Sequence, residues 1–273
     1  MKHAATILSL LFLLPVLAKA QPDCTWQPDL NADGEIGTTD LLGLLSAFGP
    51  WTRATCPEAR MQDIPESDAC NGQTFARYEG HRYPLVSVGN QCWFAENLRT
   101  TTYGNGQRIL AGLNSGEWLG ASEGAMSVYA EEEESRVYSG NPDATTNLDQ
   151  FGRLYNWFAV DDWRSLCPAG WAVPSLEDWK KLAQSLGGEE MAGALLKMEQ
   201  IGFHARLGGG RNYGGFYGSA DKAGLWWTGT SVGNLAWYVR VDADSPSLSW
   251  QKTNPKMGAA IRCIQVQAKP PRH

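Results

Sequence analysis

The sequence has 273 residues, with 29 acidic and 23 basic side chains, so its formal net charge is −6 at neutral pH. An acidic chain is a poor match for nucleic acid, because phosphate binding needs a basic surface. Charged residues make up only 19% of the chain, which also contains 30 glycines and 12 tryptophans. We therefore expect a loop-rich extracellular fold rather than a helical bundle.

The first twenty residues are typical of a secretory signal peptide. Lys2 and His3 precede an apolar run over 4–18, and the sequence AKA at 18–20 supplies the small-x-small pattern of a cleavage site. The run is too short for a membrane span, and no later stretch resembles one. We therefore expect cleavage after Ala20 and a secreted or cell-surface protein.

Composition divides the exported part into four segments. A cysteine-bracketed unit over 21–56 precedes a polar stretch over 57–68, which has two prolines and no periodicity and is typical of a linker. A large domain follows over 69–266, and a short basic tail covers 267–273.

The segment 29–40 fits the twelve-position calcium-loop pattern. Oxygen-bearing side chains occupy positions 1, 3 and 5, Gly34 allows the sharp turn at position 6, and a carboxylate stands at position 12. Position 7 would offer its backbone carbonyl, and a hard cation needs six or more oxygen ligands. The predicted Ca²⁺ ligands are Asp29, Asn31, Asp33, Glu35 and Asp40.

A helix is expected after the loop, because Leu41, Leu44, Leu45 and Phe48 share one face before the Gly-Pro pair at 49–50. No helix is expected before the loop. Such a unit resembles half of a dockerin, an EF-hand-like calcium module that usually has two repeats. With one repeat, docking to a cohesin is not expected, and we interpret the unit as a structural calcium knot. An acidic turn that binds nothing is the alternative.

The large domain contains signals for both helices and strands. Ser175 and Asp178 suggest a capping box for a helix that ends at the Gly-Gly pair at 187–188, and 189–199 suggests a second, shorter helix. Alternating apolar residues predict strands over 235–241 and 259–266. This mixture predicts an α+β fold.

Six cysteines lie after the predicted cleavage site. An even number in an exported chain predicts a disulfide framework, but spacing alone cannot choose among 15 pairings. A structural zinc site is not expected, because the chain has no C-x-x-C motif. The cysteines are Cys24, Cys56, Cys70, Cys92, Cys167 and Cys263.

A series of short motifs runs through the large domain in a fixed order. They are VGNQCWFAENLRT at 88–100, FGRLYNW at 151–157, CPAGWAVPS at 167–175, EDW at 177–179, GFHA at 202–205, GR at 210–211, LWWT at 225–228 and IRC at 261–263. Together they resemble the Fibrobacter succinogenes major paralogous domain family over about 69–266. The family's usual GWHVP has Ala172 in place of its histidine here.

The resemblance implies a compact, loop-rich α+β domain, related in fold to C-type-lectin-like domains and to sulfatase-modifying enzymes. It also implies two disulfide pairs, Cys167 with Cys263 and Cys70 with Cys92, which leaves Cys24 to pair with Cys56. The family has no known biochemical activity. The thiol chemistry of the sulfatase-modifying enzymes is not expected, since every cysteine has a disulfide partner.

No catalytic constellation emerges from the sequence. The segment 229–233 matches the G-x-S-x-G pattern of hydrolases, but that pattern requires a following helix, whereas a strand is predicted at 235–241. Adjacent carboxylates, such as the run over 131–134, are typical of solvated faces rather than of paired catalytic acids.

Aromatic residues in Gly-rich segments are the main indication of ligand binding. Exposed rings in loops commonly contact sugars or proteins, although most of these rings could instead fill the core. The preferred candidates are Tyr213, Tyr217 and Trp118, whereas Arg211 is expected to anchor its loop. The other rings considered are Trp163, Phe216 and Trp237.

These observations predict a secreted or cell-surface, calcium-binding, non-enzymatic module that binds a glycan or a surface protein. The alternatives are an extracellular enzyme that acts on polysaccharide and a purely structural surface component.

Overall fold

The computed structural model describes residue 64 and residues 67–131 and 144–266. The chain divides into two compact units, Met1–Ala59 and Arg60–His273, and the described residues belong to the second. The predicted signal peptide, the calcium loop with its five ligands, the Cys24–Cys56 pair and the tail lie outside the described residues.

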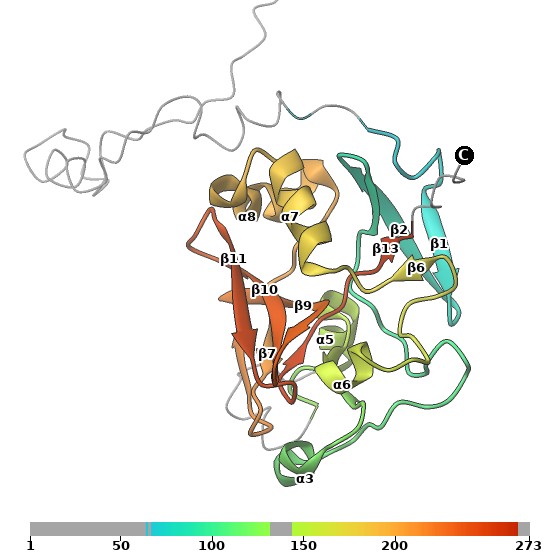
Figure 1. Cartoon of the computed structure of the whole chain (residues 1–273), viewed down its shortest axis with the longest axis vertical. Helices are drawn as coiled ribbons and strands as arrows, with labels where there is room; N and C mark the ends of the chain where they lie inside the picture. Colours follow the sequence, from blue (N-terminus) through green and yellow to red (C-terminus); the bar gives the residue numbers. More distant parts are fainter. Residues whose placement is uncertain (1–63, 65–66, 132–143, 267–273) are drawn as a thin grey trace, which may run out of the picture. The chain divides into compact units, whose positions relative to one another are not determined.

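Two β-sheets make up most of the domain, with a few short helices around them (Figure 1). The smaller sheet has the strand order β1-β2-β3-β13-β6 and is antiparallel throughout. The larger sheet has the order β11-β10-β9-β7-β12-β5-β4, with β8 paired to β7 and a parallel pairing between β7 and β9. The mixture confirms the predicted α+β class.

The strands are β1 (Phe75–Tyr78), β2 (His81–Val88), β3 (Gln91–Phe94), β4 (Met126–Ser127), β5 (Leu154–Asn156), β6 (Trp171–Ala172), β7 (Gly208–Arg211), β8 (Tyr217–Ala220), β9 (Ala223–Val232), β10 (Leu235–Asp242), β11 (Leu248–Thr253), β12 (Gly258–Ala259) and β13 (Ile264–Gln265). The helices are α3 (Ser115–Gly120), α5 (Ala144–Phe151), α6 (Trp157–Val160), α7 (Leu176–Ser185), α8 (Glu189–Lys197) and the 3-10 helix η2 (Glu199–Ile201).

Helix α7 begins where the sequence predicts. The Ser175 side chain accepts a hydrogen bond from the Asp178 backbone, and the Asp178 carboxylate accepts one from the Ser175 backbone, so the capping box is complete. Trp179 and Leu182 on its inner face are buried. In Figure 1, α7 lies beside α8 at one end of the domain, and both helices pack on one face of the larger sheet.

Strand β10 separates two hydrophobic cores. Ala236 and Tyr238 pack with one cluster, which contains the Cys167–Cys263 disulfide, whereas Val239 and Val241 pack with the other, under α7 and α8. Successive side chains of a strand point to opposite faces, so the predicted alternation is confirmed. Burial on both faces explains why neither side of this strand is strongly polar.

The final predicted strand over 259–266 is wrong in its extent. The structure instead has two short strands, β12 in the larger sheet and β13 in the smaller one. The residues between them are buried and, apart from Arg262, apolar, so the sequence resembles one continuous strand. This segment therefore connects the two sheets.

Both disulfides that the resemblance implies are present in the described domain. Cys70 is bonded to Cys92, and Cys167 is bonded to Cys263 across a sequence separation of 96 residues. The second bond fixes the loop before β6 to the segment that joins the sheets. On the chain-entropy argument, a loop of that length contributes about 4–5 kcal/mol to stability.

Candidate functional site

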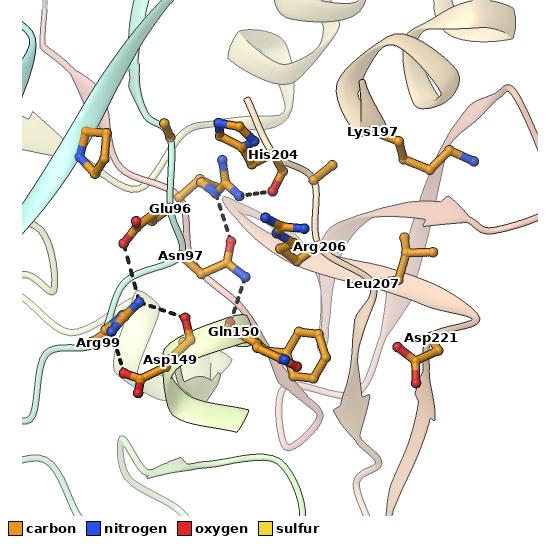
Figure 2. A pocket seen from close by; sticks show the side chains of 16 residues that line it. Glu96, Asn97, Arg99, Asp149, Gln150, Lys197, His204, Arg206, Leu207 and Asp221 are labelled. Atoms are coloured by element: carbon orange, nitrogen blue, oxygen red, sulfur yellow. Dashed lines mark hydrogen bonds and ion pairs between the residues drawn. The ribbon is translucent and has the colours of Figure 1, made fainter. Parts of the chain in front are cut away.

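A pocket of about 670 Å³ lies where four motifs that are far apart in the sequence meet (Figure 2). Its walls come from 95–99 after β3, from the end of α5 at 149–152, from 204–207 before β7, and from Arg262 between β12 and β13. We call it the Asn97 pocket. Its volume is in the range of small-ligand sites in proteins.

Asn97 holds three of these segments together. Its side-chain oxygen accepts hydrogen bonds from Arg262 Nε and from Trp226 Nε1, each at 2.8 Å. Its amide nitrogen donates to the Phe151 carbonyl at 2.8 Å. A side chain at Gly152 would place Cβ 2.8 Å from the Asn97 Cβ, and the backbone there has φ +71°. Glycine is therefore required beside Asn97.

Arg262 forms the floor of the pocket and is fully buried. Nε donates to Asn97, Nη2 donates to the His204 carbonyl at 2.9 Å, and Nη1 donates to the Phe203 and Phe94 carbonyls. Burial lowers the pKa of its guanidinium to about 9, which still leaves it protonated at neutral pH. The cation is thus held by neutral acceptors.

One wall of the pocket is a chain of alternating charges (Figure 2). Arg99 donates to the Asp149 carboxylate at 3.0 Å and to the Asp149 carbonyl at 2.8 Å. The same arginine lies 3.4 Å from the Glu96 carboxylate, which in turn lies 2.9 Å from Nε2 of His81. These contacts fix the end of α5 against the segment after β3.

The opposite wall differs, because several of its polar groups face solvent. The amine of Lys197 donates hydrogen bonds to the carbonyls of Asp242, Ala243 and Ser245 at 2.7–3.0 Å. Burial lowers the pKa of this amine. Arg206 and Asp221 are exposed. Within the described residues, neither side chain forms an ion pair or a hydrogen bond.

Most of the residues that line the pocket are polar or charged. No serine, threonine, tyrosine or cysteine lines the pocket among the residues that the structure describes, so a hydroxyl or thiol nucleophile is missing there. Glu96 and Asp149 are both engaged with Arg99. Over residues 67–131 and 144–266, no cluster of three or more His, Cys, Asp or Glu could hold a metal ion.

The aromatic residues that the sequence suggested for ligand binding differ in how exposed they are. Tyr213 is 57% exposed and lies in the turn between β7 and β8, beside Phe216, which is 62% exposed. Trp118 is fully buried, and its Nε1 donates to the Lys256 carbonyl at 2.7 Å, so its assignment as a surface ligand-binding residue is wrong. The reason is that Arg211 covers the indole, with its guanidinium carbon 4.4 Å from the ring centroid.

Tyr217 is half-buried rather than a free surface ring. It packs edge-on against Tyr129, with centroids 5.4 Å apart, and lies 4.8 Å from the Arg211 guanidinium carbon. Arg211 donates to the carbonyls of Gly215 and Leu113 at 2.9 and 2.8 Å, which confirms its predicted role as an anchor. The Gly-rich stretch is therefore an anchored hairpin rather than a free loop.

The hydrolase-like segment is part of another hairpin. Residues 229–232 complete β9, and β10 follows after a turn, so no helix follows Ser231 as a nucleophile elbow would require. Of the remaining aromatic residues considered, Trp163 is 84% exposed, and Trp237 is half-buried with Lys252 4.9 Å from its ring centroid.

These features define a disulfide-linked α+β domain with a polar pocket at the junction of its sequence motifs. The family model described as the Fibrobacter succinogenes major domain matches residues 86–265, and the chain belongs to this family. No curated protein and no solved structure matches the chain significantly. Within its described part, no helix has the length and apolar character needed to cross a membrane.

Sequence reasoning did not find the Asn97 pocket. Asn97, His204 and Arg262 were recognised as members of motifs, but their separation along the chain hid their proximity. One local signal was available. Arg262 stands within an otherwise apolar run over 257–264, and a charge in such a run must find buried partners.

Proposed function

We propose that this protein is a secreted or cell-surface, non-enzymatic module that binds a glycan in the Asn97 pocket. The main support for this proposal is that the pocket combines side chains that are fixed by internal contacts with side chains that are exposed. Its floor and one wall are fixed by internal hydrogen bonds and ion pairs, whereas the exposed groups Arg206, Asp221 and Gln150 remain at the rim. A rigid polar concavity with solvent-facing donors and acceptors suits a ligand rich in hydroxyl groups.

Binding is favoured over catalysis because of how the carboxylates are held. Hydrolysis of a sugar bond needs one acid and one base, each poised to move a proton. Glu96 and Asp149 both lie beside the cation of Arg99, which favours their charged forms. This leaves Asp221 as the one pocket carboxylate that no described cation engages.

Two further parts of the proposal come from the sequence. The fold is C-type-lectin-like, which is supported by the loop-rich arrangement and by a disulfide to the segment next to the last strand. The N-terminal unit binds one Ca²⁺ through Asp29, Asn31, Asp33 and Asp40, with the Glu35 backbone carbonyl.

The pocket is tested by filling it. Gln150 is an exposed residue on α5 that lines the pocket, so Gln150→Trp should block ligand entry without disturbing the core. Gln184→Trp is the matched control, because Gln184 is also exposed on a helix but does not line the pocket. On a glycan array, the control should keep the binding pattern of the parent protein and Gln150→Trp should lose it. Equal patterns for both variants would place the glycan site elsewhere.

The calcium unit is tested on the full exported chain. Calorimetry should detect one Ca²⁺ per molecule, and the double change Asp29→Ala and Asp33→Ala should abolish it, because two of the four side-chain ligands are removed. Undiminished binding in the double variant would move the ion to another site.

A further inference from the structure

The Asn97 pocket contains two neighbouring cations without a carboxylate partner. Arg206 and Arg262 both line it, and within residues 67–131 and 144–266 neither takes part in an ion pair. Burial is the main cause of the lowered pKa of Arg262; the charge of Glu96 raises that pKa, and the charge of Arg206, which lines the same pocket, lowers it. Like charges that face one pocket raise its affinity for an anion.

Arg262 has more N–H donors than the described acceptors around it. A guanidinium group has five N–H donors in a planar fork. In the described domain, four acceptors face it: the side-chain oxygen of Asn97 and the backbone carbonyls of Phe94, Phe203 and His204. One N–H of this fully buried cation therefore has no acceptor among the residues that the structure describes, and a buried donor of this kind is costly unless another group satisfies it.

Acceptors and donors of other kinds surround these cations. Asp221 and Gln150 lie at the rim and His204 lies beside the floor, which gives hydroxyl groups several partners of both polarities. Phe151 contributes an apolar side chain to the same lining. A simple inorganic anion would use the two arginines alone, whereas a sugar that carries a carboxylate would use the whole pocket.

We propose that the Asn97 pocket recognises a sugar acid, with its carboxylate between Arg206 and the free N–H of Arg262 and its hydroxyl groups toward Asp221, His204 and Gln150. This inference rests on the proposed function, because it names the chemical class of the ligand in the same pocket. Carboxylate and guanidinium groups match in shape and charge, so the arrangement favours an acid over a neutral sugar of the same skeleton.

The experiment compares acids with their own methyl esters. Trimers of galacturonate, glucuronate and mannuronate, and the fully methyl-esterified form of each, are titrated by calorimetry into the exported protein at low salt. Esterification removes the charge and keeps the skeleton, so at least one acid should bind about tenfold or more tightly than its ester. Binding of that acid should weaken as salt is added, and the same concentration of acetate or phosphate should not displace it.

Two arginine variants locate the effect. Arg206→Ala should lose tenfold or more in affinity for the preferred acid and little for its ester. Arg108→Ala is the matched control, because Arg108 is also exposed but does not line the pocket, and it should bind as the parent does.

The outcomes distinguish the sugar-acid proposal from the proposed glycan function. If acid and ester bind equally and Gln150→Trp abolishes both, the pocket binds glycans and the preference for an acid is wrong. If neither form of any trimer binds but an acidic tripeptide does, the pocket recognises a peptide, and both the sugar acid and the proposed glycan function fail. If acetate or phosphate competes at the same concentration as the trimers, the site holds a simple anion and the sugar-acid proposal is overturned.

Discussion

Two buried arginines of this domain are held in the same way but support different surfaces. Arg262 lies beneath the Asn97 pocket, and Arg211 lies beneath the β7–β8 hairpin, and each donates to backbone carbonyls of other segments. Arg262 joins segments from β3, the loop before β7 and the connection between the sheets. Arg211 joins a turn of its own hairpin to the segment before α3.

The two surfaces should therefore differ in how freely they can move. A pocket whose floor joins the two sheets cannot move without loosening the whole domain, so it suits a rigid, selective site. A hairpin whose second strand, β8, pairs only with β7 among the described strands can open more locally.

Loss of Arg262 should be the most damaging change. Arg262→Ala removes one of the two donors to the Asn97 oxygen and the arginine donors to three carbonyls, and it leaves a cavity, so we expect it to lower the free energy of unfolding by about 4 kcal/mol. Arg262→Lys should recover only part of this, because an ammonium group cannot reproduce the planar fork. Urea unfolding measures the free energy of unfolding of both variants. Arg206 is exposed, so Arg206→Ala should change this free energy by less than about 0.5 kcal/mol. If Arg262→Ala and Arg206→Ala had the same urea unfolding midpoint, the structural role of Arg262 would be contradicted.

Arg211→Ala should cost less, about 2–3 kcal/mol, and its effect should be local. The change removes donors to Leu113 and Gly215 and uncovers the buried ring of Trp118. Hydrogen exchange should speed up over 113–118 and 208–220 while α7 and α8 keep their protection. Uniform loss of protection would show that the hairpin is as central as the pocket floor.

Alkaline pH should weaken the core beside the pocket. Burial raises the pKa of Tyr83 and of Tyr103 to about 12, and it raises the pKa of the fully buried Tyr155. The unfolded chain releases these protons near pH 10, whereas the folded state retains them, so stability falls as pH rises from about 10 to 12 and is unaffected below that window. Circular dichroism across this range should show cooperative loss of structure. Tyr103→Phe removes one titrating group, so stability should fall less steeply with pH in this variant. An unchanged pH profile would show that Tyr103 does not contribute to the loss of stability.

The two hairpin tyrosines should differ although they lie four positions apart. Tyr217→Ala removes the contacts with Tyr129 and Arg211 and should cost about 1–2 kcal/mol. Tyr213→Ala should change stability by less than about 0.5 kcal/mol, because its ring faces solvent. Thermal melting of the two single variants separates them. Equal destabilisation would mean that Tyr213 also packs against the domain, and would remove it as a surface candidate.

The sequence by itself determined the features that depend on neighbouring residues. The capping box at Ser175, the helix after it and the alternation along β10 are set within a few residues, so local patterns were sufficient. The ordered motifs established the family, and through the resemblance they gave the pairings of Cys70 with Cys92 and of Cys167 with Cys263.

Which of these residues meet, and which are covered, depends on tertiary contacts between distant segments. Asn97 and Arg262 are 165 positions apart, and no periodicity links them, yet one hydrogen bond makes them the base of the pocket. Trp118 stands in a Gly-rich context that favours exposure, but an arginine from β7 covers it. The physical reason is that burial depends on the partner which folding brings to a residue, and that partner comes from a distant segment whose position local propensity does not determine.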